Sequence, residues 1–156
     1  MKLDLFPTTH RDGLEKVHSM VKEIRNSGIV LDPFNIAKHY GIETAFIPIM
    51  EPPALSIPDD YGKYTMYISN LVDRYSQKIL GYHELGHVLC ENLPRVHLFD
   101  HTIDHESEFL ANYFVAGFLP IFSRIKFTGS TQIEDINTYV SSLIIPITES
   151  RDITLM

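Results

Sequence analysis

Apolar residues recur every three or four positions along residues 10–27, and this spacing predicts an amphipathic helix. Gly28 ends the pattern, as glycine commonly does after the last turn of a helix. Asp32 and Pro33 then supply an N-cap and a first helical residue, so a short second helix is predicted to run to Tyr40. The N-terminal part of the chain is therefore expected to be mainly helical.

Two short segments after these helices are predicted to be strands, residues 42–47 and residues 64–69. The second is rich in β-branched and aromatic residues, which favour strands. The stretch 48–62 between them holds four prolines and two aspartates, which predicts a loop. The sequence thus predicts a short sheet before the longest helix.

The longest helical pattern begins near Asn70, which is predicted to be its N-cap, and Asn92 and Pro94 end it. Its periodic positions are Val72, Tyr75, Ile79, His83, Gly86, Leu89 and Cys90. His83 and His87 continue the line of Ile79 along the helix, so both histidines extend a face that is otherwise apolar.

Two more helices are predicted in the C-terminal half. One runs from Glu106 to Leu119, with Asp104 as its cap and Pro120 at its end. The other opens at a capping box over residues 131–134 and ends before Pro146. Together the elements predict an α+β fold that is mostly helical, with a short β-sheet preceding the long helix.

Composition narrows the class of protein. A length of 156 residues fits one domain, and a formal net charge of −7 argues against direct nucleic-acid binding, which needs a basic surface. No apolar run approaches about 18 residues and no signal-peptide pattern is present, so neither a membrane span nor export is expected. Cys90 is the single cysteine, which excludes an internal disulfide and favours a cytoplasmic location.

Residues 83–87 read His-Glu-Leu-Gly-His, an H-E-x-x-H motif. Residues four apart on a helix share one face, with Cβ atoms about 5–6 Å apart, so His83 and His87 can bind one Zn²⁺. Glu84 is turned by roughly 100° and faces the open side of the metal, where it can act as general base toward a water. The motif therefore predicts one zinc ion per chain, with Glu84 as the catalytic residue.

A catalytic zinc site usually has three protein ligands, and the third is expected on the following helix. Glu108 has Asn112 four residues later on the same face, and its amide oxygen could accept the remaining N–H of a ligand histidine. Glu106 has Leu110 in the equivalent place. We therefore predict that Glu108 is the third ligand and that Asn112 supports a ligand histidine. The alternatives for the third ligand are Glu106, His97, His101 and His105.

Two ordered motifs give the chain a resemblance to a known family. His83-Glu84-Leu85-Gly86-His87 is followed by Glu108-x-x-Ala111-Asn112-x-Phe114 and then by Phe118-Leu119-Pro120. This order resembles the ImmA/IrrE metallopeptidases, over roughly residues 10–120. The resemblance implies a small zincin-like domain over residues 1–120, and residues 121–156 are expected to form a C-terminal helical extension and tail packed on the same domain.

The resemblance also implies a function, that of a cytoplasmic zinc endopeptidase. Family members often occur in phages and integrative elements and cleave a helix-turn-helix repressor, so the expected partner is a protein substrate of that kind. Carried over by position, His83, His87 and Glu108 are the implied zinc ligands and Glu84 the implied base. An oxyanion donor remains open among Tyr82, His101, His105 and Tyr113. The alternative function is a zinc-containing binding or toxin-like module that acts by protein contact without proteolysis.

Overall fold

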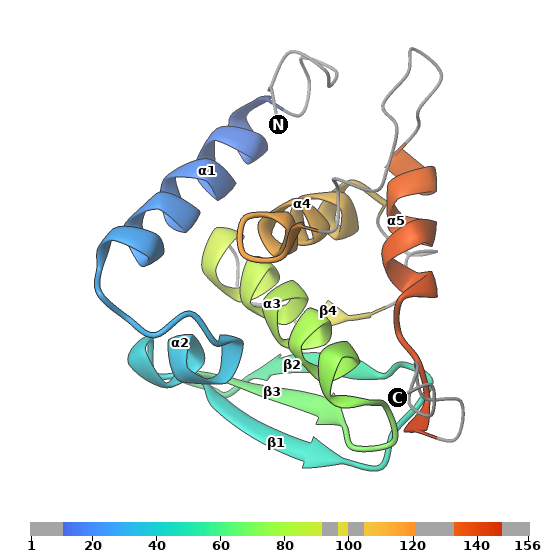
Figure 1. Cartoon of the computed structure of the whole chain (residues 1–156). Helices are drawn as coiled ribbons and strands as arrows, with labels where there is room; N and C mark the ends of the chain where they lie inside the picture. Colours follow the sequence, from blue (N-terminus) through green and yellow to red (C-terminus); the bar gives the residue numbers. More distant parts are fainter. Residues whose placement is uncertain (1–10, 92–96, 100–104, 121–132, 148–156) are drawn as a thin grey trace.

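The chain folds as a mixture of helices and a small sheet, in a computed structural model that describes residues 11–91, 97–99, 105–120 and 133–147 (Figure 1). Its α+β class agrees with the prediction from the sequence. The elements in chain order are α1 (Arg11–Asn26), α2 (Pro33–His39), β1 (Glu43–Ile47), β2 (Ala54–Pro58), β3 (Tyr64–Ser69), α3 (Arg74–Cys90), β4 (His97–Leu98), α4 (His105–Ala116) and α5 (Ile133–Ser142).

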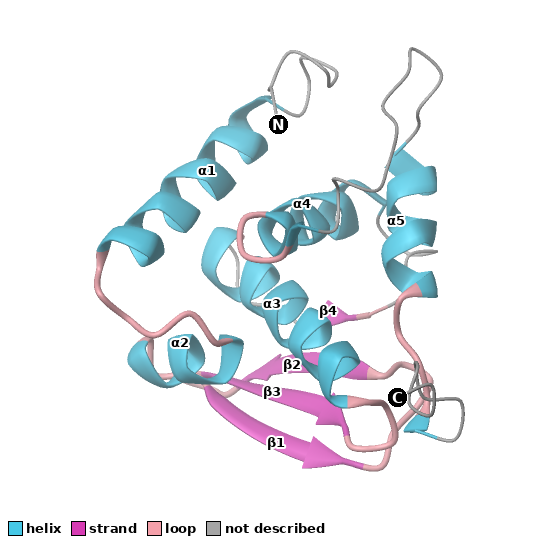
Figure 2. Ribbon diagram, viewed as in Figure 1, coloured by secondary structure: helices cyan, strands magenta, loops and turns pink. Residues whose placement is uncertain are grey.

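The four strands form one sheet in the order β1-β3-β2-β4. β3 is parallel to β1 and antiparallel to β2, and the short β4 pairs antiparallel with β2. The helices lie on one side of this sheet, with α3 crossing above the strands (Figure 2). Ser56 of β2 and Met66 of β3 are register partners and fully buried, so both belong to the face covered by the helices.

The prediction of a loop over residues 48–62 was wrong, because β2 lies inside that range. Pro52 and Pro53 precede the strand and Pro58 is its last residue, so none of these prolines interrupts it. Leu55, Ser56 and Ile57 alternate between half-buried, buried and exposed, as the two faces of a strand require. The prolines mark where the strand begins and ends, and the prediction took them as evidence against any strand.

The long helix was predicted almost to its C-terminal end but begins later than expected. Asp73, not Asn70, is the N-cap of α3, and its carboxylate accepts a hydrogen bond of 2.8 Å from the backbone N–H of Ser76. Every residue from Ile79 to His87 is buried, because the helix packs against the sheet, α2 and α4 at once. The helix is therefore a central element rather than one with a single apolar stripe.

The start of α3 is also held by a segment from the far end of the described chain, residues 143–147. Ser76 bonds to this segment twice, donating from Oγ to the carbonyl of Leu143 (3.3 Å) and accepting from the N–H of Ile145 (2.8 Å). The backbone N–H of Asp73 donates to the carbonyl of Ile145 at 2.9 Å, and Val72 forms a β-bridge with Pro146. The two segments therefore anchor each other although about seventy residues separate them along the chain.

The last two helices complete the core. α4 packs along α3 and ends at Ala116, three residues before the predicted end at Leu119. α5 packs on α4 and buries Val140 fully. Within the described residues, no helix combines the length and the apolar character that crossing a membrane requires. The predicted cap at Asp104, the start of the capping box at residues 131–132 and the tail from residue 148 lie outside the described residues.

Candidate metal centre

The candidate site lies where α3 packs against α4. Gly86 makes this contact close, because a Cβ atom at that position would lie 3.0 Å from both the Cα of Ala111 and the Cβ of Phe114. α3 contributes His83 and His87 to the site, and α4 contributes Glu108. The absence of a side chain at Gly86 therefore allows the two helices to approach closely, which brings both histidines and this carboxylate together.

Donor atoms of three side chains converge between the helices. Nε2 of His87 lies 3.1 Å from Nε2 of His83 and 2.8 Å from Oε1 of Glu108. Nε2 of His83 lies 2.9 Å from Oε2 of the same carboxylate. The donor atoms of His83, Glu84 and His87 also lie within 4.8 Å of one another, so this buried group could hold a metal ion.

The donor set fits zinc in number, type and spacing. Two imidazole nitrogens and one carboxylate are a ligand set of catalytic zinc sites. With zinc–ligand bonds of about 2.0–2.1 Å, ligand atoms at tetrahedral angles are roughly 3.3 Å apart. The observed separations of 2.8–3.1 Å need to widen by only a few tenths of an ångström, so the side chains are already arranged around one small space.

Asn112 fixes the orientation of His83. Its Oδ1 lies 2.7 Å from Nδ1 of the ring, and because an amide oxygen only accepts, Nδ1 carries the proton. In a neutral ring with this tautomer, Nε2 has a lone pair directed at the donor cluster. The amide nitrogen of Asn112 in turn donates to Oδ1 of Asn137 on α5 at 2.8 Å, which keeps the amide in this orientation. The structure thus has the predicted contact between Asn112 and a histidine of the motif.

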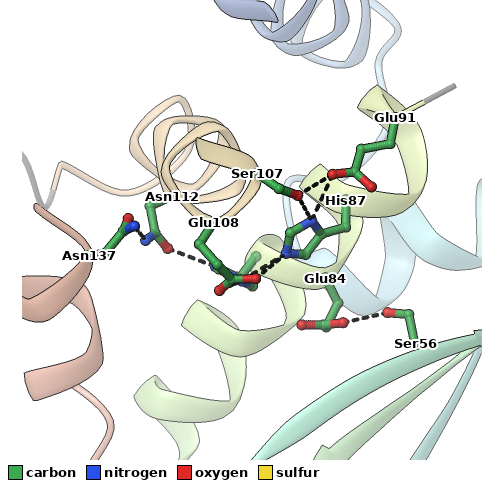
Figure 3. A network of polar contacts seen from close by, with 9 residues as sticks. Ser56, Glu84, His87, Glu91, Ser107, Glu108, Asn112 and Asn137 are labelled. Atoms are coloured by element: carbon green, nitrogen blue, oxygen red, sulfur yellow. Dashed lines mark hydrogen bonds and ion pairs between the residues drawn. The ribbon is translucent and has the colours of Figure 1, made fainter. Parts of the chain in front are cut away.

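His87 has its own polar partners on the other ring nitrogen. Ser107 Oγ lies 3.2 Å from Nδ1, and Glu91 Oε1 lies 3.5 Å from it (Figure 3). Burial lowers the pKa of His87, but the hydrogen bonds to Glu108 and Glu91 and the charges of Glu84 and Glu108 outweigh burial and raise the pKa to about 10. The pocket therefore stabilises one positive charge beside its carboxylates, the charge that a bound cation would also supply.

Glu84 lies beside the donors and is fully buried. Its Oε1 accepts a 2.5 Å hydrogen bond from Ser56 on β2, whereas its Oε2 is buried and has no hydrogen-bond partner among the described residues (Figure 3). Burial raises the pKa of this carboxyl above its ordinary value, although the charges of His87 and His83 and the bond from Ser56 oppose the shift. A buried carboxylate oxygen without a partner is costly, which points to a group that binds there.

The site is covered in this conformation. The exposed fractions of His83, Glu84, His87 and Glu108 lie between 0% and 4%. Phe99 contributes to the cover, since its ring centre lies 4.6 Å from that of His83 and its backbone N–H donates to the carbonyl of Ala54 on β2. Phe99 also lines a cavity of about 580 Å³, together with Met50, Glu51, Pro52, Pro53, Ser141 and Ile144. A cavity in the usual size range of ligand pockets therefore borders the same aromatic residue that covers the donor cluster.

Other predicted residues have different surroundings. Two candidates for an oxyanion donor have contacts apart from the donor cluster: the ring of Tyr82 stacks on Phe118, with ring centres 4.8 Å apart, and the hydroxyl of Tyr113 bonds to His18 on α1 at 2.6 Å. Burial raises the pKa of Cys90 to about 12, as expected of a structural thiol. His101 and the side chains of His97, His105 and Glu106 lie outside the described residues, so those alternatives remain predictions.

Four residues of the site were not found from the sequence: Ser56, Glu91, Ser107 and Asn137. Glu91 follows His87 by four residues on the same helix, a spacing that could have indicated it. Ser107 stands directly before the predicted ligand Glu108. Ser56 and Asn137 depend on how β2 and α5 pack, and no local pattern reveals that.

The chain was compared with protein-family models, with curated proteins and with solved structures, and none of these comparisons found a match.

Proposed function

We propose that this protein is a zinc-dependent endopeptidase. The observation that carries the proposal is the meeting of His83, His87 and Glu108 around one buried space, with the carboxylate of Glu84 beside it. A structural zinc site is typically closed by four protein ligands. Here three donors meet, and a buried carboxylate oxygen next to them lacks a hydrogen-bond partner among the described residues. This combination is typical of hydrolytic zinc sites.

Each residue has a defined task in this proposal. His83 and His87 present Nε2 to the metal, and Glu108 supplies the negative charge that makes the site selective for a cation. Asn112 keeps the proton of His83 on Nδ1. Zinc, when bound, supplies a Lewis acid that polarises a carbonyl and makes water more acidic.

Glu84 moves the proton. Ser56 occupies Oε1, so Oε2 is the atom available to take a proton from the attacking water. The same carboxyl then returns the proton to the nitrogen of the leaving amine. Burial raises the pKa of this carboxyl above its ordinary value, which makes Glu84 a stronger base toward that proton.

The proposed substrate is a cytoplasmic regulatory protein, a helix-turn-helix repressor of a phage or mobile element. This part rests on the order of the two motifs, His83 to His87 and then Glu108 to Phe114, which resembles the ImmA/IrrE family. The net charge of −7 supports a protein rather than a nucleic acid as the binding partner.

Zinc content and one isosteric variant test the proposal. Elemental analysis is expected to find about one zinc per wild-type chain and little in Glu108→Ala, because a site with three ligands loses much of its affinity when one ligand is removed. Glu84→Gln is expected to keep its zinc but to lose peptidase activity. Activity is measured by mass spectrometry as cleavage of a helix-turn-helix repressor encoded beside the gene. Glu15→Gln is the matched control, because it makes the same substitution at an exposed position of α1. Cleavage by Glu84→Gln at the wild-type rate would refute the mechanism.

A second candidate function is favoured by the burial of the site. With exposed fractions of 0–4%, the donor side chains are as buried as those of a structural zinc site, whose metal only stabilises the fold. A binding or toxin-like module could contain such a site. Such a module keeps its biological effect in Glu84→Gln, since that variant retains the metal ligands. Loss of the effect together with retained zinc would therefore support the peptidase and exclude the contact module.

A further inference from the structure

A carboxylate beyond the proposed ligands is connected to the site. Glu91 is the C-cap of α3, one turn after His87, and its side chain is 22% exposed. Its Oε1 accepts a hydrogen bond from Oγ of Ser107, the α4 residue directly before Glu108. Ser107 Oγ also lies 3.2 Å from Nδ1 of His87 (Figure 3). A chain of polar atoms therefore runs from a ring nitrogen of His87 through Ser107 to Glu91.

The chemistry of the carboxylate sets the direction of this chain. An ionised carboxylate only accepts, so the hydroxyl of Ser107 donates its hydrogen bond to Glu91. The lone pair of that hydroxyl then faces Nδ1 of His87, which must carry a proton to donate. When the ring is neutral, as a metal ligand must be, the proton on Nδ1 leaves the lone pair on Nε2, the atom that lies among the donors of Glu108 and His83.

The position of Glu91 supports a role other than stabilising the helix. The C-terminal end of a helix carries partial negative charge, which disfavours an acidic side chain there. The C-cap of α3 nevertheless carries this carboxylate, and it points back at His87 and Ser107 (Figure 3). Its contacts therefore offset an unfavourable placement.

We propose that Glu91, acting through Ser107, is a positioning residue for the metal centre. It holds the ring of His87 with Nε2 toward the metal, as Asn112 does for His83. This inference rests on the zinc site of the proposed function and extends it, because each histidine then has its own polar partner: an amide from α4 for one, and a carboxylate relayed by a hydroxyl for the other. Such partners commonly change metal affinity by about 10–100-fold.

The test measures zinc affinity of the full chain by competition with a chromogenic chelator. Glu91→Ala is expected to weaken zinc binding about 10–100-fold, and Glu91→Gln is expected to recover most of it, because the amide oxygen can still accept from Ser107. Glu23→Ala, an exposed glutamate of α1, is the matched control and should bind zinc like the wild type. Visible absorption of the Co²⁺-loaded proteins reports ligand geometry, and its bands should change in the alanine variant and return in the glutamine variant.

Two further measurements separate the possible outcomes. The denaturation midpoint of the metal-free protein should be similar in Glu91→Ala and wild type, which distinguishes a positioning role from a structural one. If that variant does not fold, Ser107→Ala interrupts the relay from the other helix and should also weaken zinc binding about 10-fold. Zinc affinity within twofold of wild type, with unchanged Co²⁺ bands in the foldable variants, would overturn the inference and leave the proposed function intact. Normal zinc binding without proteolysis in the wild type would overturn only the function, and a wild type that binds no zinc would overturn both.

Discussion

Gly86→Ala should weaken metal binding although it changes neither a ligand nor a charge. The added Cβ would lie 3.0 Å from Ala111 Cα, 3.0 Å from Phe114 Cβ and 3.2 Å from the carbonyl oxygen of Ala111. Two of these three atoms are backbone, so rotating a side chain cannot remove the contact. α4 must move away from α3 by several tenths of an ångström, and it carries Glu108 with it.

The magnitude follows from two opposing contributions to the free energy of unfolding. Overpacking a tight contact costs about 1–3 kcal/mol. Replacing glycine with alanine inside a helix gains about 1 kcal/mol. The metal-free protein should therefore lose roughly 0–2 kcal/mol. Zinc binding has to restore the close approach of the helices. The free energy of zinc binding should therefore become less favourable by up to about 1–3 kcal/mol, which is roughly 5- to 150-fold in affinity.

The assay pairs this variant with Gly81→Ala on the same helix. A Cβ on Gly81 would meet side chains of α2, at 2.9 Å from Pro33 Cβ and 3.0 Å from Phe34 Cε1. Both variants should change the urea denaturation midpoint, but only Gly86→Ala should change the zinc dissociation constant measured by chelator competition. Equal zinc affinity in Gly86→Ala and wild type would refute the argument that this glycine sets the spacing of the ligands.

Three further predictions follow from individual contacts. Asn112→Ala removes the buried acceptor of His83 and should cost about 1–3 kcal/mol of stability and about 10–100-fold in zinc affinity; an unchanged chelator titration would contradict this. Asp73→Ala removes the carboxylate that accepts from the N–H of Ser76 and should lower the free energy of unfolding by about 1 kcal/mol, measured by urea denaturation. An unchanged denaturation midpoint would contradict this. Burial raises the pKa of Cys90 from 9.0 to about 12, so the protonated thiol stabilises the fold fully below about pH 9 and this contribution is lost as the pH rises toward 12. Alkylation by iodoacetamide at pH 8 should be at least about 100-fold slower in the folded than in the denatured protein, and similar rates would disprove the shift.

The sequence predicted the centre of the site better than its surroundings, and the reason is the range of the interactions. The spacing of His83 and His87, and of Glu108 and Asn112, is a property of single helices, so a period of 3.6 residues shows which side chains share a face. The contact between Asn112 and His83 joins two helices, but it required only that the helices pack with those faces together.

The rest of the site depends on packing that no short stretch of sequence encodes. Ser56 reaches Glu84 only because β2 forms in a proline-rich segment and lies below α3. Asn137 reaches Asn112 only because α5 packs on α4. The N-cap of α3 is Asp73 and not the predicted Asn70, because Val72 forms a β-bridge with Pro146 of the C-terminal segment. In each case a tertiary contact decided between local alternatives.

The anchoring of α3 by residues 143–147 has a consequence for biosynthesis. A ribosome completes the helix that bears both histidines about fifty residues before it makes the segment that holds the first turn of that helix, a delay of roughly 3–10 s at usual rates of translation. Asn137, which orients the amide beside His83, also arrives during this interval. The nascent chain therefore has its motif long before it has a preorganised site, and the proposed zinc would bind only after α5 and residues 143–147 have been made.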